Sequence, residues 1–331
     1  MHNILDHSEL KRQLTSYMLS VMSSFTEIKQ MAAYKEVDAG QVAEDVFRII
    51  TGRNYSHLSR GKAGKYKSDI IHHVKQDVQA GSPVTFFYDL GPGYHASLYP
   101  GQLDLSYEAG LSELFALYQM NEFCKEVSEI YSNGAKFFII IDNLCALATN
   151  DIPVEKTAQY CSGLRSLIKE AGDQHNIQLL VESELFAETD YPRLELPVEN
   201  LITQPLAEGV VENVSRFVGR HCDMHEAQAR IDIYAKASEV TENNLAGVVT
   251  GVRLTQRATE NTLGFRSFPG GDSRIQAGEI ALKHNKKGKL GPTLLTSRNI
   301  SDYDLHRFEL PAGVPDSLQH ITYVRPAKHQ Q

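Results

Sequence analysis

Asp142 is the residue whose type and place in the sequence most clearly suggest chemistry. It follows the apolar run Phe137–Ile141, and together with Asn143 the segment reads FFIIIDN. A continuous apolar run of this length predicts a strand buried on both faces. A carboxylate at the carboxyl end of such a strand could orient a substrate amine or transfer a proton, and Asn143 beside it could bind substrate. The alternative is a structural role as a helix cap or as the start of a loop, because Asp and Asn commonly begin the loop that follows a strand.

A second group of reactive side chains lies in the loop Asp89–Gln102, which follows the strand expected at Val84–Tyr88. This loop reads DLGPGYHASLYPGQ and contains a phenol, an imidazole and a hydroxyl close together: Tyr94, His95 and Ser97. These groups could supply acid–base and positioning chemistry beside Asp142. The alternative is that His95 is an ordinary, exposed loop histidine.

Cationic and amide side chains in the last third of the chain could bind an anionic substrate. The segment GVRLTQRAT contains Arg253, Gln256 and Arg257, and Arg298 and Asn299 follow later. Because a guanidinium group binds a carboxylate or a phosphate with two hydrogen bonds, we expect these residues to bind substrate. The alternative is an exposed face with ordinary surface charges.

The elements that must position these residues alternate between apolar strands and helices. Strands are expected at 84–88, 136–142 and 177–182, and helices at 8–22, 41–50, 68–79, 106–131, 154–171 and 206–234. This pattern predicts a parallel sheet covered by helices on both faces. Ligands of such sheets bind outside the carboxyl ends of the strands, which here means the segments 89–102, 142–148 and 182–186. Later strand candidates at 248–256, 279–284 and 320–325 predict an antiparallel addition to the sheet or a small second lobe.

The charge balance and the missing motifs exclude several classes of function. The net charge is −8, which argues against nucleic acid or an anionic membrane as the main partner. The basic loop 53–67 could close over an anionic substrate or simply be solvated. The sequence has no GxGxxG after the first strand, no Walker motif and no GxSxG motif. The segment His221–His225, HCDMH, lacks the glutamate of a metalloprotease helix, so no metal site is expected.

The expected location is the cytoplasm. The N-terminal segment lacks the pattern of a signal peptide, and no apolar run is long enough for a membrane helix. The four cysteines form no CxxC pair and are expected to be buried, reduced thiols.

The order of several segments resembles that of a known family. A strand leads to a proline-rich polar loop, and the helix LSELFALYQMNEFCKEVSEIY follows. Then come the turn Tyr131–Lys136, YSNGAK, and the apolar strand that ends in Asp142. The later segment GVRLTQRAT and the ending Tyr323–Pro326, YVRP, are also similar. In these features the chain resembles the isocyanide (isonitrile) synthases of the pyoverdine/dityrosine biosynthesis family.

The resemblance implies a Rossmann-like fold with no nucleotide cofactor, so no cofactor is expected. Family members convert the α-amine of tyrosine or tryptophan to an isonitrile, and the added carbon comes from the C2 carbonyl of ribulose 5-phosphate. The chain would then be an isonitrile synthase-like enzyme of secondary metabolism whose small-molecule partners are an amino acid and a sugar phosphate. The expected division is an N-terminal helical segment with the basic loop, residues 1–80, and a Rossmann-like catalytic domain with a C-terminal β-rich addition, residues 81–331.

Three positions depart from the family pattern. His95 stands where the family usually has a lysine, Asn143 stands where it has a glycine, and Arg257 stands where a histidine is expected. A histidine does not give the stable positive charge of a lysine at neutral pH unless its pKa is raised. The departures therefore predict a divergent member. They leave open a related transferase or lyase that acts on another amino-acid-derived substrate, and a non-catalytic binding protein. A homodimer is also left open.

Overall fold

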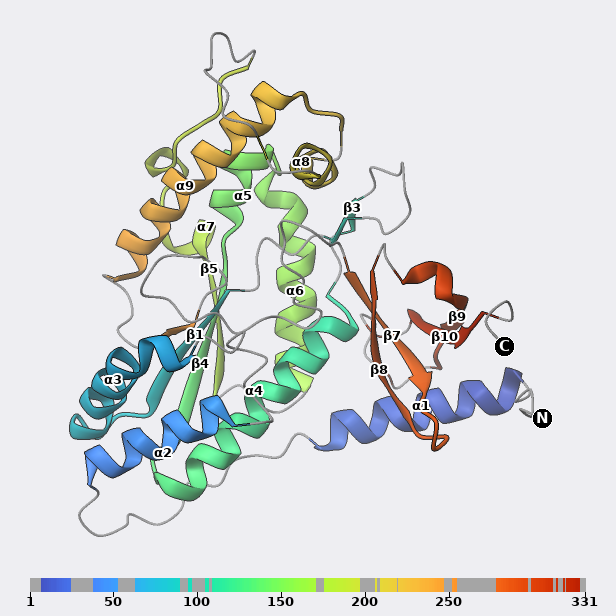
Figure 1. Ribbon diagram of the computed structural model, residues 1–331, viewed down its shortest axis with the longest axis horizontal. Helices are drawn as coiled ribbons and strands as arrows, with labels where there is room; N and C mark the ends of the chain where they lie inside the picture. The colour runs from blue at the N-terminus through green and yellow to red at the C-terminus, as the bar shows by residue number, and fades with distance from the viewer. Residues whose placement is uncertain are drawn as a thin grey trace.

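The structure, a computed structural model, has helices packed around two separate four-stranded β-sheets (Figure 1). The residues it describes are 7–24, 38–52, 63–89, 95–96, 105–106, 109–170, 176–196, 206, 209–218, 220–246, 252–254, 278–296, 299–311, 314, 318 and 320–327.

Four strands form a parallel sheet in the larger part of the molecule. In spatial order they are β5 (Ile177–Val181), β4 (Ala135–Ile141), β1 (Val84–Asp89) and β6 (Val252–Leu254), and every neighbouring pair runs parallel. The central strands β1 and β4 have the continuous apolar sequences that burial on both faces requires. The predicted Rossmann-like α/β fold is therefore confirmed.

Three phenylalanine side chains join one face of this sheet to α4 (Leu111–Ile130). Phe86 and Phe137 stack with their ring centroids 5.3 Å apart, and Phe123 of α4 meets them edge-on at 5.0 and 5.6 Å. Each of these rings is almost fully buried. Edge-to-face aromatic contacts add to the free energy gained from burial alone, so this cluster is a main source of stability in the sheet.

Helices lie on both faces of the parallel sheet. The helix α6 (Val154–Glu170) joins α4 on the Phe86 face, and α2 (Ala39–Thr51) and α3 (Lys67–Gln79) extend the same core beside β1. On the opposite face, Phe87 and Ile140 pack against Leu245, near the end of α9 (Met224–Ala246).

Short helices gather beyond the carboxyl ends of β4 and β5. The chain turns from β4 directly into α5 (Asn143–Asn150) and from β5 directly into α7 (Glu182–Leu185). The long helix α9 packs across α5, and α8 (Val210–Val218) lies beside α9 (Figure 1). The remaining short elements are η1 (Ala63–Tyr66), η2 (Glu188–Asp190), η3 (Ile300–Asp302), β2 (His95–Ala96) and β3 (Leu105–Ser106).

The second sheet contains the strands β8 (Leu290–Thr296), β7 (Gly278–His284), β10 (His320–Pro326) and β9 (Tyr303–Glu309), in that spatial order. The pairs β7–β8 and β9–β10 are antiparallel, as predicted. The pair β7–β10 is parallel, so the C-terminal addition, whose antiparallel pairs were predicted, is a mixed sheet.

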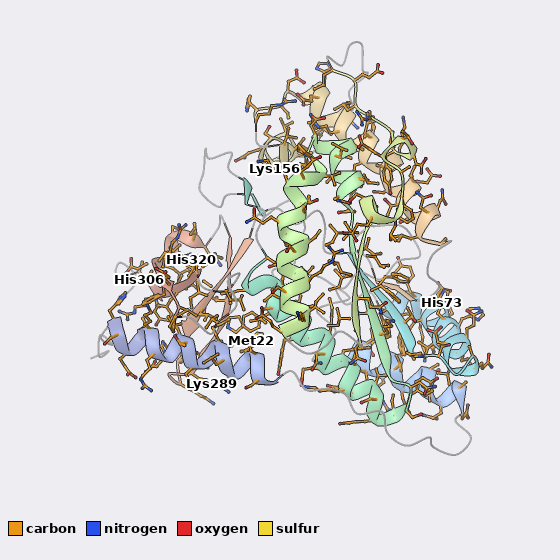
Figure 2. The ribbon with its side chains drawn as sticks, turned by 180° about the vertical axis from the view of Figure 1, so that it is seen from behind. Met22, His73, Lys156, Lys289, His306 and His320 are labelled. Atoms are coloured by element: carbon orange, nitrogen blue, oxygen red, sulfur yellow. The ribbon has the colours of Figure 1, made fainter. Side chains whose placement is uncertain are left out.

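The helix α1 (His7–Ser24) packs on this second sheet, although it comes from the opposite end of the sequence (Figure 1). His7 stacks on Phe308 with ring centroids 4.8 Å apart, and the side chains of Gln13 and His284 lie 3.3 Å apart as hydrogen-bond partners. Figure 2 places Met22 of α1 near this sheet, whereas His73 of α3 lies at the far side of the molecule. The helices of the predicted segment 1–80 thus pack on two different sheets, and the domain division stays a prediction.

Several elements were not predicted. The strands β8 and β9 are both edge strands of the second sheet. Pro292 lies within β8, which an edge strand tolerates because one side of it needs no partner. Only Val252–Leu254 of the candidate strand 248–256 is described, and it joins the parallel sheet rather than the C-terminal one.

Within the described residues, no helix combines the length and the apolar character that crossing a bilayer requires.

We predict that Phe137→Ala lowers the free energy of unfolding by about 3–5 kcal/mol, because it removes a fully buried ring and leaves a cavity. The matched control is Phe138→Ala, since Phe138 is the next residue in β4, lies on the other face and is only half-buried. Urea unfolding followed by circular dichroism should show a smaller loss for the control. Equal losses would contradict the assignment of the main core to the Phe137 face.

Candidate active site

The register of the parallel sheet sets two acidic residues side by side at its carboxyl edge. Ile141 of β4 is paired with Val181 of β5, and each strand ends there. The next residues, Asp142 and Glu182, therefore leave the sheet at the same level. This edge is where parallel sheets bind ligands, so it is the candidate active site.

Asn143 joins the two strand ends through its side chain. Its Nδ2 donates hydrogen bonds to Oγ of Ser183 at 2.8 Å and to Oγ1 of Thr157 at 3.2 Å, and its Oδ1 accepts from the N–H of Ser183 at 3.1 Å. Asn143 is 1 % exposed. The side chain thus holds α5 and α7 in a fixed relation, and its predicted role in substrate binding stays a prediction.

Glu182 is buried beside Asn143 and accepts hydrogen bonds from two directions. Its Oε2 accepts from the backbone N–H groups of Leu144 and Cys145, each at 3.1 Å, and its Oε1 accepts from the hydroxyl of Thr241 in α9. The two N–H groups belong to the first turn of α5, where a negative charge is favourable because the peptide dipoles of the helix point their positive ends there. Glu182 therefore joins α5, α7 and α9 and is only 1 % exposed.

Asp142 occupies the N-cap position of α5, and it is 7 % exposed. Its carboxylate makes no capping hydrogen bond to the helix, because Glu182 takes the amides of the first turn. The simplest structural alternative, in which Asp142 serves as the cap, therefore does not apply. Its predicted catalytic role stays a prediction.

The polar network continues from Glu182 toward Tyr191. The hydroxyls of Thr241 and Tyr191 lie 3.3 Å apart, and Thr241 also donates to the carbonyl of Ala237 at 3.2 Å. Burial, together with the nearby Glu182 carboxylate, raises the pKa of Tyr191 well above its ordinary value. Tyr191 is therefore a neutral phenol at physiological pH and a hydrogen-bonding member of the network.

The other end of α5 is held by a buried arginine. Arg230 of α9 donates to the backbone carbonyl of Thr149 and to Oδ2 of Asp151 at 2.6 Å, and its Nε donates to Glu226 at 2.9 Å. Asp151 ends the helix in the left-handed conformation, with φ of 55°. Glu226 in turn accepts two hydrogen bonds from Arg220, at 2.6 and 2.9 Å. Charged groups of opposite sign thus fix both ends of α5.

Most of the other predicted site residues lie outside the described residues. These are Tyr94, Ser97, Gln256, Arg257 and Arg298. The same holds for residues 53–62 of the basic loop.

The structure gives the backbone positions of His95 and Arg253. His95 lies in β2 with Ser106 of β3 as its partner. In the register of the sheet, Arg253 of β6 pairs with Phe87 of β1, and Phe87 pairs with Phe138 of β4. Phe138 comes four residues before Asp142. At about 3.3 Å per residue, that is roughly 13 Å along the strand from the level of Asp142. The backbone of Arg253 is therefore well short of the edge.

Asn299 is described, and it begins η3 between β8 and β9 of the second sheet, where its carbonyl accepts from the N–H of Asp302 at 3.0 Å. It belongs to a different sheet from Asp142 and Asn143. Among the side chains described, the structure thus brings only Asp142 and Asn143 of the predicted set together.

Glu182 and Thr241 were not predicted as site residues. Glu182 lay within a strand-end segment that the sequence singled out, but nothing in the sequence distinguished it from Glu184, which is exposed and paired with Arg165. Thr241 lies in a long polar helix, and only the packing of α9 across α5 brings it to the edge.

The four cysteines are buried thiols, as predicted. Burial raises the pKa of Cys161 to about 11, so it carries almost no thiolate at neutral pH. Within the described residues, no three His, Cys, Asp or Glu side chains gather as metal ligands.

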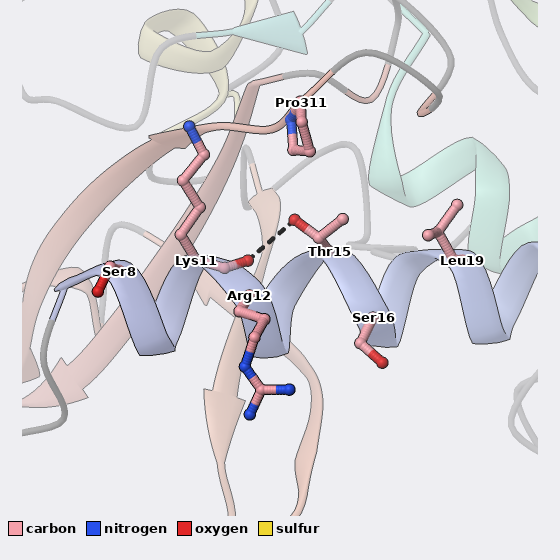
Figure 3. A pocket seen from close by; sticks show the side chains of 7 residues that line it. All are labelled: Ser8, Lys11, Arg12, Thr15, Ser16, Leu19 and Pro311. Atoms are coloured by element: carbon pink, nitrogen blue, oxygen red, sulfur yellow. Dashed lines mark hydrogen bonds between the residues drawn. The ribbon is translucent and has the colours of Figure 1, made fainter.

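A hollow lies on α1, away from the sheet edge (Figure 3). It has a volume of about 470 Å³ and is open to solvent on the outer side of α1, with Lys11, Arg12, Thr15 and Pro311 among its lining residues. Arg12 already donates two hydrogen bonds to Glu9, at 2.7 and 2.9 Å. The hollow offers no group of buried polar side chains comparable to the network around Glu182.

A parallel sheet with a buried polar network at its carboxyl edge defines the chain as a Rossmann-like α/β protein. The family model described as "Pyoverdine/dityrosine biosynthesis protein" matches residues 105–249, which include β4, α5, Glu182 and all of α9. The resemblance to this family that the sequence predicted is thus confirmed.

Comparison of structures agrees with this match. The crystal structure of the PvcA protein from Pseudomonas aeruginosa is similar with a TM-score of 0.52, over 80 % of this chain and 96 % of that chain. The sequences are 16 % identical, so the similarity concerns the fold. No curated protein sequence matches this chain.

We predict that Glu226→Gln destabilises the protein at pH 7 by about 1 kcal/mol, because solvent partly screens the ion pairs that are lost. Hydrogen bonds from Arg220, followed by those from Arg230, hold the pKa of Glu226 at about 2, below its ordinary value of 4.5. A group with a lowered folded-state pKa stabilises the fold above its unfolded-state pKa and loses this effect as the pH falls toward the folded value.

The difference in unfolding free energy between Glu226→Gln and the unaltered protein should therefore be full at pH 7 and shrink below about pH 4.5. Urea unfolding at several pH values measures it. Glu155→Gln, at an exposed position on α6, is the control and should show a small difference throughout. A difference that stays constant down to about pH 3 would contradict the ion-pair assignment.

Proposed function

We propose that the chain is an isonitrile synthase-like enzyme of secondary metabolism. It converts the amine of an amino acid to an isonitrile and takes the added carbon from ribulose 5-phosphate. The observation that carries this proposal is the match of residues 105–249 to the pyoverdine/dityrosine biosynthesis family, because it spans the strand β4 and the edge with Asp142.

The chemistry of the proposed reaction suits a buried carboxylate at this edge. Condensation of an amine with a ketone carbonyl loses water, so protons must leave the amine nitrogen and reach the carbonyl oxygen. A carboxylate that is 7 % exposed and does not cap its helix is suited to such transfers. We assign this role to Asp142, with Tyr94, His95 and Ser97 as its proposed partners from the loop after β1.

Binding of the two substrates requires cations for a carboxylate and for a phosphate. We assign this role to Arg253, Arg257 and Arg298, because a guanidinium group binds either anion with two hydrogen bonds. Gln256 and Asn299 complete the proposed set. The proposed enzyme works in the cytoplasm, needs no cofactor and has no nucleic-acid or membrane partner.

One observation favours a second candidate, a related transferase or lyase that acts on a different amino-acid-derived substrate. Asn143 stands where the family pattern has a glycine, and its side chain makes three hydrogen bonds inside the site. A glycine would leave that volume empty and the N–H of Ser183 without this acceptor. The site next to Asp142 is thus built differently from the family pattern, which is a reason for a different substrate.

We predict that the purified protein forms an isonitrile from tyrosine or tryptophan and ribulose 5-phosphate. Mass spectrometry with ribulose 5-phosphate labelled with ¹³C at C2 measures it, because the label should appear in the isonitrile carbon. Omission of either substrate is the control. No isonitrile from any amino acid would contradict the first proposal. A labelled product that is not an isonitrile would support the second.

We predict that Asp142→Asn lowers the rate of product formation by about 10²-fold or more, as expected for loss of a general acid–base group. The asparagine is nearly isosteric, so the unfolding free energy should change little. Asp190→Asn, at an exposed position in η2 after β5, is the matched control and should keep full activity. Full activity of a folded Asp142→Asn variant would favour a non-catalytic role for this edge.

A further inference from the structure

We infer that Glu182 is a positioning residue, an internal anion that occupies the N-terminus of α5 and thereby fixes the backbone of Asp142. This inference depends on the proposed function for one point, which is the catalytic role of Asp142. The geometry around Glu182 stands on its own hydrogen bonds.

The first step of the argument is the place of the carboxylate. In open parallel sheets, the N-terminus of a helix that follows a central strand is where a phosphate or another anion binds, because free N–H groups and the helix dipole favour negative charge. Here the amides of Leu144 and Cys145 are both taken by Oε2 of Glu182, at 3.1 Å each. The protein's own side chain thus fills the place of a ligand anion, and a substrate phosphate must bind elsewhere.

The second step is that the two neighbouring acidic residues, Asp142 and Glu182, have different roles at the start of α5. Asp142 and Glu182 leave the sheet at the same level. The residue at the N-cap position, Asp142, does not cap α5, whereas Glu182 from the neighbouring strand end does. Glu182 therefore makes the capping hydrogen bonds of α5, and the carboxylate of Asp142 makes none of them.

The third step is that Glu182 is itself held from the far side. The hydroxyl of Thr241 donates to Oε1 of Glu182, and α9 carries Thr241 across the top of α5. The backbone N–H groups of Leu144 and Cys145 are thus linked to Thr241 of α9 through the Glu182 carboxylate, beside the contact of the Cys145 side chain with Ser238 at 4.0 Å. Removal of that carboxylate should loosen the first turn of α5 and displace Asp142 without removing any substrate contact.

The test uses three variants of the full chain. Glu182→Ala removes the carboxylate. Glu182→Gln keeps the shape, because its Oε1 can accept from the two amides and its Nε2 can donate to Thr241, whose hydroxyl then donates to the carbonyl of Ala237. Glu184→Ala is the matched control in the same short helix, since Glu184 is exposed and contacts only Arg165 among the hydrogen bonds described.

The first measurement does not depend on activity. Hydrogen–deuterium exchange by mass spectrometry of a peptide that covers residues 141–147 should be about tenfold faster or more in Glu182→Ala, and close to that of the unaltered protein in the two other variants. Formate should raise the melting temperature of Glu182→Ala in a saturable manner, because it restores a carboxylate in the vacated space. Exchange that is unchanged in Glu182→Ala, or equally faster in Glu184→Ala, would overturn the inference.

The second measurement is the kinetics of product formation. Glu182→Ala should lower kcat by about tenfold or more with little change in KM, because it misplaces a reacting group rather than a binding group. Glu182→Gln and added formate should each restore much of the rate. A folded Glu182→Ala variant with unchanged kcat, beside an inactive Asp142→Asn, would overturn the positioning role.

The failure of the proposed function looks different from the failure of this inference. If no isonitrile forms, the proposed function fails, and if Asp142→Asn keeps full activity, the proposed catalytic role of Asp142 fails. Exchange and formate rescue of the melting temperature then still decide whether Glu182 fixes the first turn of α5.

Discussion

Burial of the Glu182 carboxylate is the constraint on which the arrangement of this edge depends. A charge removed from water is costly unless hydrogen-bond donors surround it. Here the donors come from two elements that are far apart in the sequence: the first turn of α5, directly after β4, and Thr241 in α9. If either element shifted, one oxygen of the carboxylate would lose its hydrogen-bond donor. The position of α9 over the sheet and the start of α5 are thus determined together, and Asp142 lies at their junction.

The helix α5 shows how charges can stabilise a helix too short to form alone. Isolated helices of this length are marginal in water, because nucleation is costly. An anion at the N-terminus and a cation at the C-terminus both interact favourably with the helix dipole. Glu182 and Arg230 supply these two charges, and both are nearly fully buried. The strong interactions of α9 with both ends of α5 explain why a long and mostly polar helix packs so closely there.

The sequence predicted the strands β1, β4 and β5 of the central sheet and the edge where Asp142 and Asn143 lie, because buried parallel strands have continuous apolar runs that few other structures share. It could not predict β8, which contains Pro292, or β9, which contains several charged residues. These two segments are strands because β7 and β10 provide hydrogen-bond partners. It also missed Glu182, since burial of one glutamate and exposure of its neighbour Glu184 depend on the packing of α9. Asp142 and Asn143 were correctly placed together at the edge, while their predicted chemical roles remain to be tested.

The contact of α1 with the second sheet has a consequence for the synthesis of the chain. The helix α1 precedes the second sheet by most of the sequence, yet its buried residues Leu10, Leu14 and Met18 belong to a core that is completed by strands that begin only at Gly278. The apolar side of α1 thus waits for most of the polypeptide to be made before it can be covered. Contacts between such distant parts of a chain also slow folding, because a long loop must close before any of them forms. Until the second sheet is synthesised, the apolar side of α1 stays exposed to water, and exposed apolar segments of this kind favour aggregation.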